Sequence, residues 1–273
     1  EQGANVVPFT MELVPEWEVV VPRRPQTPEP PFPYGEREVA YANETDGTKL
    51  AGTLTVPMGN GPFSAALLIT GSGPQSRDEE IFGHKPFLVI ADHLTRNGIA
   101  VLRVDDRGIG GSTGDMSMAT SEDFASDVLA GVCFLAGQPE IDPSRIGLVG
   151  HSEGGIIASM VAAESDDVAF IVLLAGSAIP GRDLMVMQLA AVQRSIGRPE
   201  GNVEQQIEAQ RSLLELASEG ADLPALTAAV AELTRIQISN VVEGQRPSTE
   251  ELKPAIEAQA RQLTTPWWRF FLT

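Results

Sequence analysis

The chain has 273 residues, with 37 acidic against 19 basic side chains and a formal net charge of −18. This acid excess argues against a nucleic-acid or anionic-membrane surface, because both need clustered Lys and Arg. The single cysteine excludes an intramolecular disulfide and any zinc or redox site of the CxxC type. The longest apolar runs, such as Val168 to Ala175, are far too short to span a bilayer.

The N-terminal segment is rich in proline, with eight of the twenty prolines in residues 1–33. Proline at this spacing restricts φ and removes backbone donors, so residues 1–35 are predicted to form an extended, semi-rigid linker or the remnant of an N-terminal region. The chain has no initiator Met, and its last residues, 266–273, are mostly apolar without a terminating signal. We therefore expect the sequence to be incomplete at both ends.

Residues 36–180 show the pattern of a sheet covered by helices. Segments 36–43 and 49–56 alternate apolar and polar residues around a Gly-containing turn, which predicts a β-hairpin. Short runs rich in Val, Ile and Leu follow, typical of buried parallel strands, at residues 65–70, 99–104, 146–150 and 169–175. Helical patterns separate them at residues 87–97, 121–136 and 154–163. This alternation predicts an α/β core with a mostly parallel sheet and flanking helices.

The pattern changes after residue 180. Four amphipathic helices are predicted with no strand between them, at Arg182 to Ile196, Val203 to Ser218, Leu223 to Ile238 and Thr249 to Leu263. Their acidic residues are expected to form solvated helix faces. Such a group of helices after a sixth strand predicts an inserted helical cap over residues 181–265. Residues 266–273 would then begin the return to the core.

The strongest chemical signal is the segment Gly150–Gly155, which reads G-H-S-E-G-G. It follows a predicted strand and precedes a helix rich in small residues, the context that G-x-S-x-G requires. The glycines suit a tight, strained turn, in which larger side chains would clash with the strand or the helix. The turn would place the hydroxyl of Ser152 at a helix N-terminus, where developing negative charge is favoured. Ser152 is therefore the predicted nucleophile.

A second glycine-containing loop, Thr70–Pro74, directly follows another predicted strand. Glycines in such a loop let backbone N–H groups point into a site. An oxyanion hole needs two such donors, one of them from the residue after the nucleophile. We therefore predict an oxyanion hole made by the backbone N–H groups of Ser72 and Glu153.

A third loop, Asp105–Ser112, half-matches a dinucleotide-binding fingerprint. Its third glycine is misplaced and no helix opens immediately behind it, so we expect no bound cofactor. Asp and Arg of this loop are expected to brace the loops around the site by ion pairing. No HExxH or similar ligand spacing occurs, so no metal is implied. Cys133 is predicted to be a buried helix residue.

Three motifs now stand in order: G-S-G-P-x-x-R-D at residues 71–78, D-x-R-G-x-G-x-S at residues 105–112, and the G-H-S-E-G-G turn. Together they resemble the α/β-hydrolase superfamily, specifically its bacterial carboxylesterases and serine-aminopeptidase-like hydrolases. The similarity covers roughly Glu36 to Ala178. It implies an α/β-hydrolase fold with an inserted helical cap. The last strands of that fold's sheet are expected to be missing from this chain.

Such a site also needs a His to accept the serine proton and an acid to hold that His, in the chain order Ser, acid, His. No histidine follows Ser152. His151 is adjacent to Ser152 in a turn whose neighbours point apart, and His93 lies inside a predicted helix. Only His84, after the oxyanion loop, could approach. We expect the acid and the His to lie beyond residue 273.

The sequence thus predicts a serine hydrolase of carboxylic esters that works through an acyl-enzyme. Two alternatives stay open. The same machinery cleaves amides, so the chain could belong to a serine peptidase or aminopeptidase-like hydrolase. With no base in view, a non-catalytic hydrolase-fold binding protein is the other. The expected partner is a small-molecule ester or peptide, and nothing in the sequence indicates the compartment or the oligomeric state.

Overall fold

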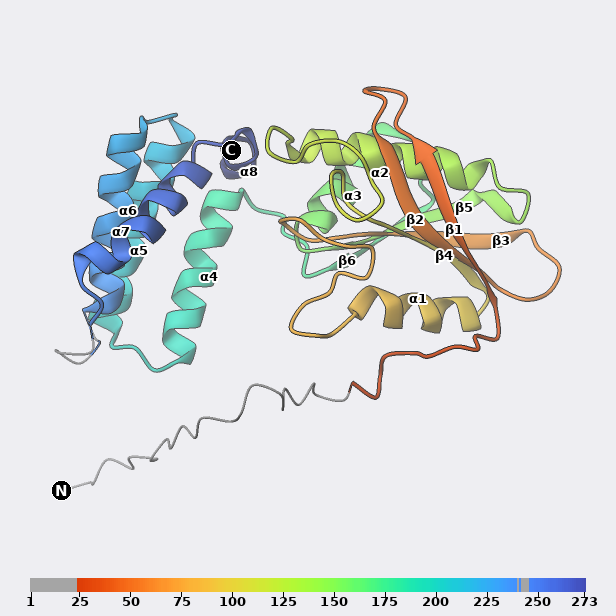
Figure 1. Cartoon of the computed structure of the whole chain (residues 1–273), viewed down its shortest axis with the longest axis horizontal. Coiled ribbons are helices and arrows are strands. Elements are labelled where there is room, and N and C mark those ends of the chain that lie inside the picture. The colour runs from red at the N-terminus through yellow and green to blue at the C-terminus, as the bar shows by residue number, and fades with distance from the viewer. Residues whose placement is uncertain (1–23, 240, 242–245) are drawn as a thin grey trace, which may run out of the picture.

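The computed structural model describes residues 24–239, 241 and 246–273, so most of the proline-rich segment predicted at residues 1–35 lies outside the described residues. Six strands form one sheet in the order β1-β2-β4-β3-β5-β6 (Figure 1). Their bounds are β1 Gly35–Ala42, β2 Lys49–Val56, β3 Phe63–Ile69, β4 Ile99–Val104, β5 Ile141–His151 and β6 Phe170–Leu174.

Strand directions confirm the predicted topology. The hairpin β1–β2 is antiparallel, and β2 pairs antiparallel with β4. Strands β4, β3, β5 and β6 all run parallel. The carboxyl ends of these four strands therefore share one edge of the sheet, and the loops that follow β3, β4 and β5 meet there.

Helices cover both faces of the sheet (Figure 1). Their bounds are α1 Pro86–Arg96, α2 Ser121–Ala136 and α3 Glu153–Glu164. Along β3, Leu67 packs in the cluster that includes residues of α2 and α3, whereas its neighbour Leu68 packs in the cluster that includes α1 residues. This alternation is what a strand with two buried faces requires.

Beyond residue 180 the described chain is helical (Figure 1). The helices are α4 Gly181–Ser195, α5 Glu200–Ser218, α6 Leu223–Ile238, α7 Thr249–Gln262 and α8 Pro266–Leu272. They share an apolar cluster of their own, in which Leu213, Leu226 and Val230 are almost fully buried. Local chemistry sets the helix starts: Ser248 and Glu251 form a reciprocal capping box at α7. The division at residues 180 and 265 remains a prediction.

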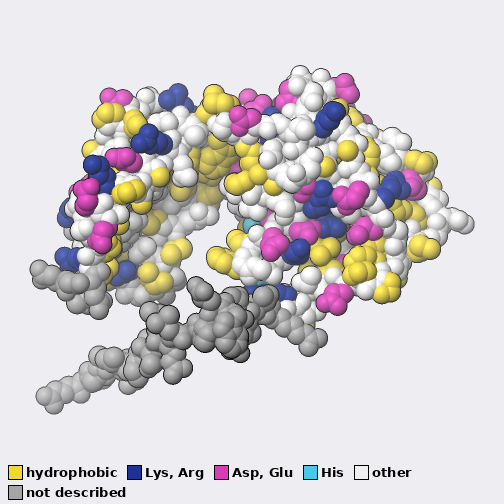
Figure 2. Space-filling view, in the orientation of Figure 1, with side chains coloured by type: hydrophobic (Ala, Val, Ile, Leu, Met, Phe, Trp, Pro, Cys, Tyr) yellow, Lys and Arg dark blue, Asp and Glu magenta, His cyan; other side chains and the backbone are white. Residues whose placement is uncertain are grey.

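Acidic and basic side chains are interspersed over both the sheet part and the helical part of the molecule (Figure 2). Within the described residues, no helix is long and apolar enough to cross a membrane. The prediction for Cys133 was wrong: its side chain is exposed on α2. An apolar neighbourhood in the sequence does not bury a residue that the helical period turns to solvent.

The sheet core yields a direct test. Leu148 on β5 is fully buried, whereas Leu129 on α2 is 37% exposed. We expect Leu148→Ala to lower the free energy of unfolding by about 2 to 5 kcal/mol, because it removes buried contacts and leaves a cavity. The matched variant Leu129→Ala should cost less than about 1 kcal/mol. Urea unfolding followed by circular dichroism measures both, and equal losses would contradict the assigned core.

Candidate active site

Ser152 occupies the single residue between the end of β5 and the start of α3. Its backbone is left-handed, with φ 53° and ψ −116°. This conformation is strained for a residue with a side chain and persists only where the surroundings hold it. Here the Ser152 N–H donates to the Leu174 carbonyl at 2.9 Å, and its own carbonyl accepts from Gly155 N–H at 3.0 Å. The turn predicted for the nucleophile is therefore present.

The glycines around Ser152 are needed for backbone contact. A Cβ on Gly150 would lie 2.0 Å from the Gly154 carbonyl oxygen, and one on Gly154 would lie 2.3 Å from the Ile69 carbonyl oxygen. Both distances are far below van der Waals contact with backbone atoms that cannot move aside. Helix α3 therefore approaches the end of β3 as closely as only glycine permits.

The loop that contains Ser72 runs against this turn. A Cβ on Gly71 would lie 3.4 Å from Cβ of Ser152. The N–H of Glu153 is the first of α3 and so has no acceptor within the helix. The N–H of Ser72 has no hydrogen-bond partner among the residues that the structure describes. The fold thus brings the loop of Ser72 beside Ser152, and among the described residues neither predicted donor has a protein acceptor.

The side chain of Glu153 has a separate structural role. It is 3% exposed, and its Oε1 accepts from Ser121 Oγ at 2.6 Å and from Trp267 Nε1 at 2.7 Å. These two bonds join the start of α3 to the start of α2 and to α8. A carboxylate in the first turn of a helix also interacts favourably with the helix dipole.

Asp106 holds the two ends of the Ser72 loop. Its Oδ1 accepts from Thr70 Oγ1 at 2.7 Å and its Oδ2 accepts from Gln75 N–H at 2.9 Å. Burial raises the pKa of Asp106 to about 7, and the nearby carboxylates of Glu153 and Glu79 add to the rise. The two hydrogen bonds act in the opposite direction. Asp106 therefore changes its charge near neutral pH.

The ion pairs expected of the Asp105–Ser112 loop are present. The Asp105 carboxylate accepts two hydrogen bonds from the Arg77 guanidinium, at 2.7 and 3.0 Å. Although burial opposes it, these bonds hold the pKa of Asp105 below its usual range. Arg107 likewise donates to Asp127 on α2 at 2.8 and 2.9 Å. The loop after β4 is therefore fixed on both sides.

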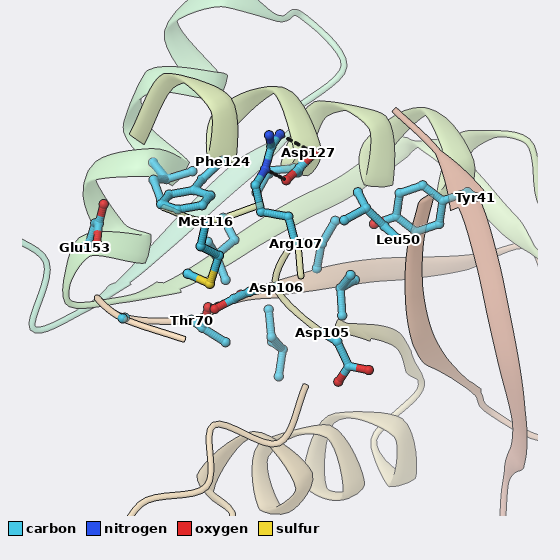
Figure 3. Close-up of a pocket in the computed structure, with 18 residues that line it drawn as sticks. Tyr41, Leu50, Thr70, Asp105, Asp106, Arg107, Met116, Phe124, Asp127 and Glu153 are labelled. Carbon is cyan, nitrogen blue, oxygen red and sulfur yellow. Dashed lines mark hydrogen bonds and ion pairs between the residues drawn. The ribbon is translucent and has the colours of Figure 1, made fainter. Parts of the chain in front are cut away.

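A cavity of about 60 Å³ lies between the sheet and α2, beside Thr70 (Figure 3). Apolar side chains such as Met116 and Phe124 form part of its wall, and Asp106 and Glu153 border it. Gly71 and Gly73 of the Ser72 loop also line it. The cavity therefore borders both the Ser72 loop and the start of α3, where Glu153 directly follows Ser152.

None of the three histidines hydrogen-bonds to Ser152 within the described residues. His151 Nδ1 lies 2.7 Å from Glu79 Oε1, His84 Nδ1 lies 2.9 Å from Gln26 Nε2, and His93 belongs to α1. Among the same residues, no group of three or more His, Cys, Asp or Glu side chains is arranged to hold a metal ion. Sequence reasoning missed Glu79, whose only signal is its place directly after the R-D of the Ser72 loop motif.

Comparison with known proteins places these features in a family. The model of the family described as serine aminopeptidase, S33, matches residues 86–239, more than half of the chain. This range includes Ser152 and begins after the Ser72 loop. Membership of this family confirms the predicted α/β-hydrolase fold, and the described residues form a mixed sheet of six strands flanked by helices.

Two curated relatives are also similar. Esterase EstD of Thermotoga maritima is 34% identical over 156 residues, which cover 57% of this chain and 37% of that protein. Thiohydrolase aneE of Aspergillus aculeatus is 36% identical over 114 residues, 41% of this chain and 33% of that protein. The chain thus spans only about a third of the length of these relatives. A solved esterase structure from Pyrococcus furiosus is 20% identical, covering 79% of this chain and 64% of its own, with a TM-score of 0.49.

The raised pKa of Asp106 predicts a pH dependence of stability. Between about pH 4 and 7 the unfolded chain carries Asp106 ionised while the folded protein keeps it protonated, so stability falls as pH rises. Asp106→Asn removes this titration and can keep both hydrogen bonds. From pH 5 to pH 8 the wild type should lose about 2 to 3 kcal/mol relative to Asp106→Asn.

Denaturant unfolding of the full-length protein at the two pH values measures this difference. Asp115→Asn is the matched control, because Asp115 bonds only to Ser117 within the described residues. That variant should follow the wild-type curve. Parallel pH curves for the wild type and Asp106→Asn would show that Asp106 does not titrate in this range.

Proposed function

The chain belongs to the serine aminopeptidase S33 family, and from this membership we propose that it provides the nucleophile and the oxyanion hole of a serine hydrolase acting on carboxylic esters. The observation that carries the proposal is the strained, left-handed turn at Ser152, set at the start of α3 and beside Gly71. The similarity to an esterase over 156 residues supports the choice of substrate class.

In the proposed reaction, Ser152 Oγ attacks the ester carbonyl carbon and the carbonyl electrons move to its oxygen. The N–H groups of Ser72 and Glu153 donate to this oxyanion. A general base takes the Ser152 hydroxyl proton and passes it to the leaving oxygen, so the oxyanion collapses and expels the alcohol. Water then releases the acid from the acyl-enzyme. We assign the role of proton acceptor to none of the three histidines. His151 contacts Glu79, His84 contacts Gln26, and His93 lies within α1.

The same proposal gives the two parts of the chain different roles. Residues 36–180 would form the hydrolase core and residues 181–265 the cap, with residues 266–273 returning to the core. The hydrogen bond from Trp267 to Glu153, next to Ser152, supports placing the end of the cap near the site. Residues 1–35 would form a proline-rich linker ahead of this core.

Labelling by a fluorophosphonate tests the nucleophile. The full-length protein should be labelled covalently, because the probe forms a bond with an activated serine. Ser152→Ala should lose all labelling, whereas Ser144→Ala, a change at an exposed serine bonded to Asp142, should label like the wild type. Mass spectrometry of the labelled peptide identifies the site. Absence of label on the wild type, or label that persists in Ser152→Ala, would refute the proposal.

The family description also favours a second candidate, a peptidase that cleaves aminoacyl amides. Rates on matched p-nitrophenyl esters and aminoacyl p-nitroanilides, measured as kcat/KM on the full-length protein, distinguish the two. We expect the ester to be preferred by at least about tenfold, which corresponds to 1.4 kcal/mol in transition-state binding. A ratio in favour of the amide would replace the esterase assignment with the peptidase.

A further inference from the structure

One buried carboxylate joins the two loops of the proposed site. Glu79 is 5% exposed and follows the Ser72 loop in sequence. Its Oε1 accepts from the Gly71 N–H at 2.8 Å and lies 2.7 Å from His151 Nδ1. A single oxygen atom thus contacts both the loop after β3 and the turn after β5.

The positions of these two partners are significant. Gly71 directly precedes Ser72, and His151 directly precedes Ser152 and lies two residues before Glu153. The two proposed oxyanion donors belong to separate segments, with no covalent link closer than some eighty residues. Their separation therefore depends on noncovalent contacts between the segments. The Glu79 oxygen is such a contact, made one residue from the first donor and two from the second.

Glu79 is itself held in an uncommon conformation. Its backbone is left-handed, with φ 50°, and its N–H donates to the Ser76 carbonyl at 2.8 Å. A left-handed residue with a side chain costs about 1 kcal/mol or more, which the surrounding contacts must offset. The adjacent Glu80 has no comparable role: its carboxylate is half exposed and lies 3.6 Å from Lys85.

We propose that Glu79 is a positioning residue, which sets the distance between the N–H groups of Ser72 and Glu153 by joining Gly71 to His151. This role rests on the proposed function. Oxyanion donors act at 2.7–3.1 Å from the developing charge, and loss of one donor lowers turnover by about 10² to 10³-fold. Displacement of the Ser72 loop by about 1 Å has a cost of similar size.

Three substitutions separate geometry from charge. Glu79→Gln keeps an oxygen at the same reach, which can accept from both Gly71 N–H and a His151 Nδ1–H. Glu79→Asp keeps the charge but withdraws the oxygens by one methylene, so it cannot reach both partners. Glu79→Ala removes the contact. Glu80→Ala is the matched control.

The readout is the rate of fluorophosphonate labelling at Ser152 in the full-length protein. Its dependence on probe concentration gives two separate quantities, the inactivation rate constant and the binding constant of the probe. We expect Glu79→Ala and Glu79→Asp to lower the inactivation rate constant by about 30- to 300-fold, with probe binding changed by less than about threefold. Glu79→Gln should stay within about fivefold of the wild type, and Glu80→Ala should match it. If Glu79→Ala does not fold, the pair Glu79→Asp and Glu79→Gln carries the test.

Hydrogen exchange at Gly71 gives a measurement that does not need the reaction. Exchange of this amide should accelerate in Glu79→Asp and Glu79→Ala but not in Glu80→Ala. If the wild type is labelled and Glu79→Asp and Glu79→Ala are labelled just as fast, the role of Glu79 is overturned while the proposed function stands. A wild type that does not label at Ser152 would overturn the proposed function and this role together. Full activity of Glu79→Asp with loss in Glu79→Gln would show that charge, not reach, is what matters.

Discussion

The close approach of helix α3 to the ends of β3 and β5 is the constraint on which the site depends. The helix starts so near these strands that a single methyl group at Gly150 or Gly154 would overlap backbone atoms. With the helix in this position, the chain has one residue in which to pass from strand to helix. That residue, Ser152, must take the left-handed conformation. The first N–H of α3, that of Glu153, then has no acceptor within its own helix.

Acidic side chains surround a loop whose proposed role is to stabilise negative charge. Glu79 and Glu153 are almost fully buried, and both lie near enough to Asp106 to raise its pKa. Each carboxylate would disfavour an oxyanion through repulsion if it were bare. Instead, each accepts hydrogen bonds: Gly71 N–H for Glu79, Ser121 and Trp267 for Glu153, Thr70 and Gln75 for Asp106. The bonds to Glu79 and Asp106 hold the Ser72 loop, and those to Glu153 join α3 to α2 and α8.

Most of the core could be predicted from local patterns. The strand Ile99–Val104 and the helix Ser121–Ala136 agree to the residue, because an apolar run marks the strand and an apolar stripe marks the helix. The start of β5 was missed, since residues 142–145 read Asp-Pro-Ser-Arg and the last three of them are exposed, although the strand already pairs at Ile141. Glu79 could not be assigned either. Its contact with His151 spans 72 residues, and only the folded chain brings such groups together.

The hydrogen bond from Trp267 to Glu153 has a mechanical meaning as well. It spans 114 residues of chain, and helices α4 to α7 lie wholly within that span. The helical part is therefore attached to the core at two points, covalently ahead of α4 and through this bond at α8. Helices α4 to α7 thus form a loop of chain whose two ends are both held at the core. Any displacement that carries α8 away from the core has to break the bond between the indole and Glu153.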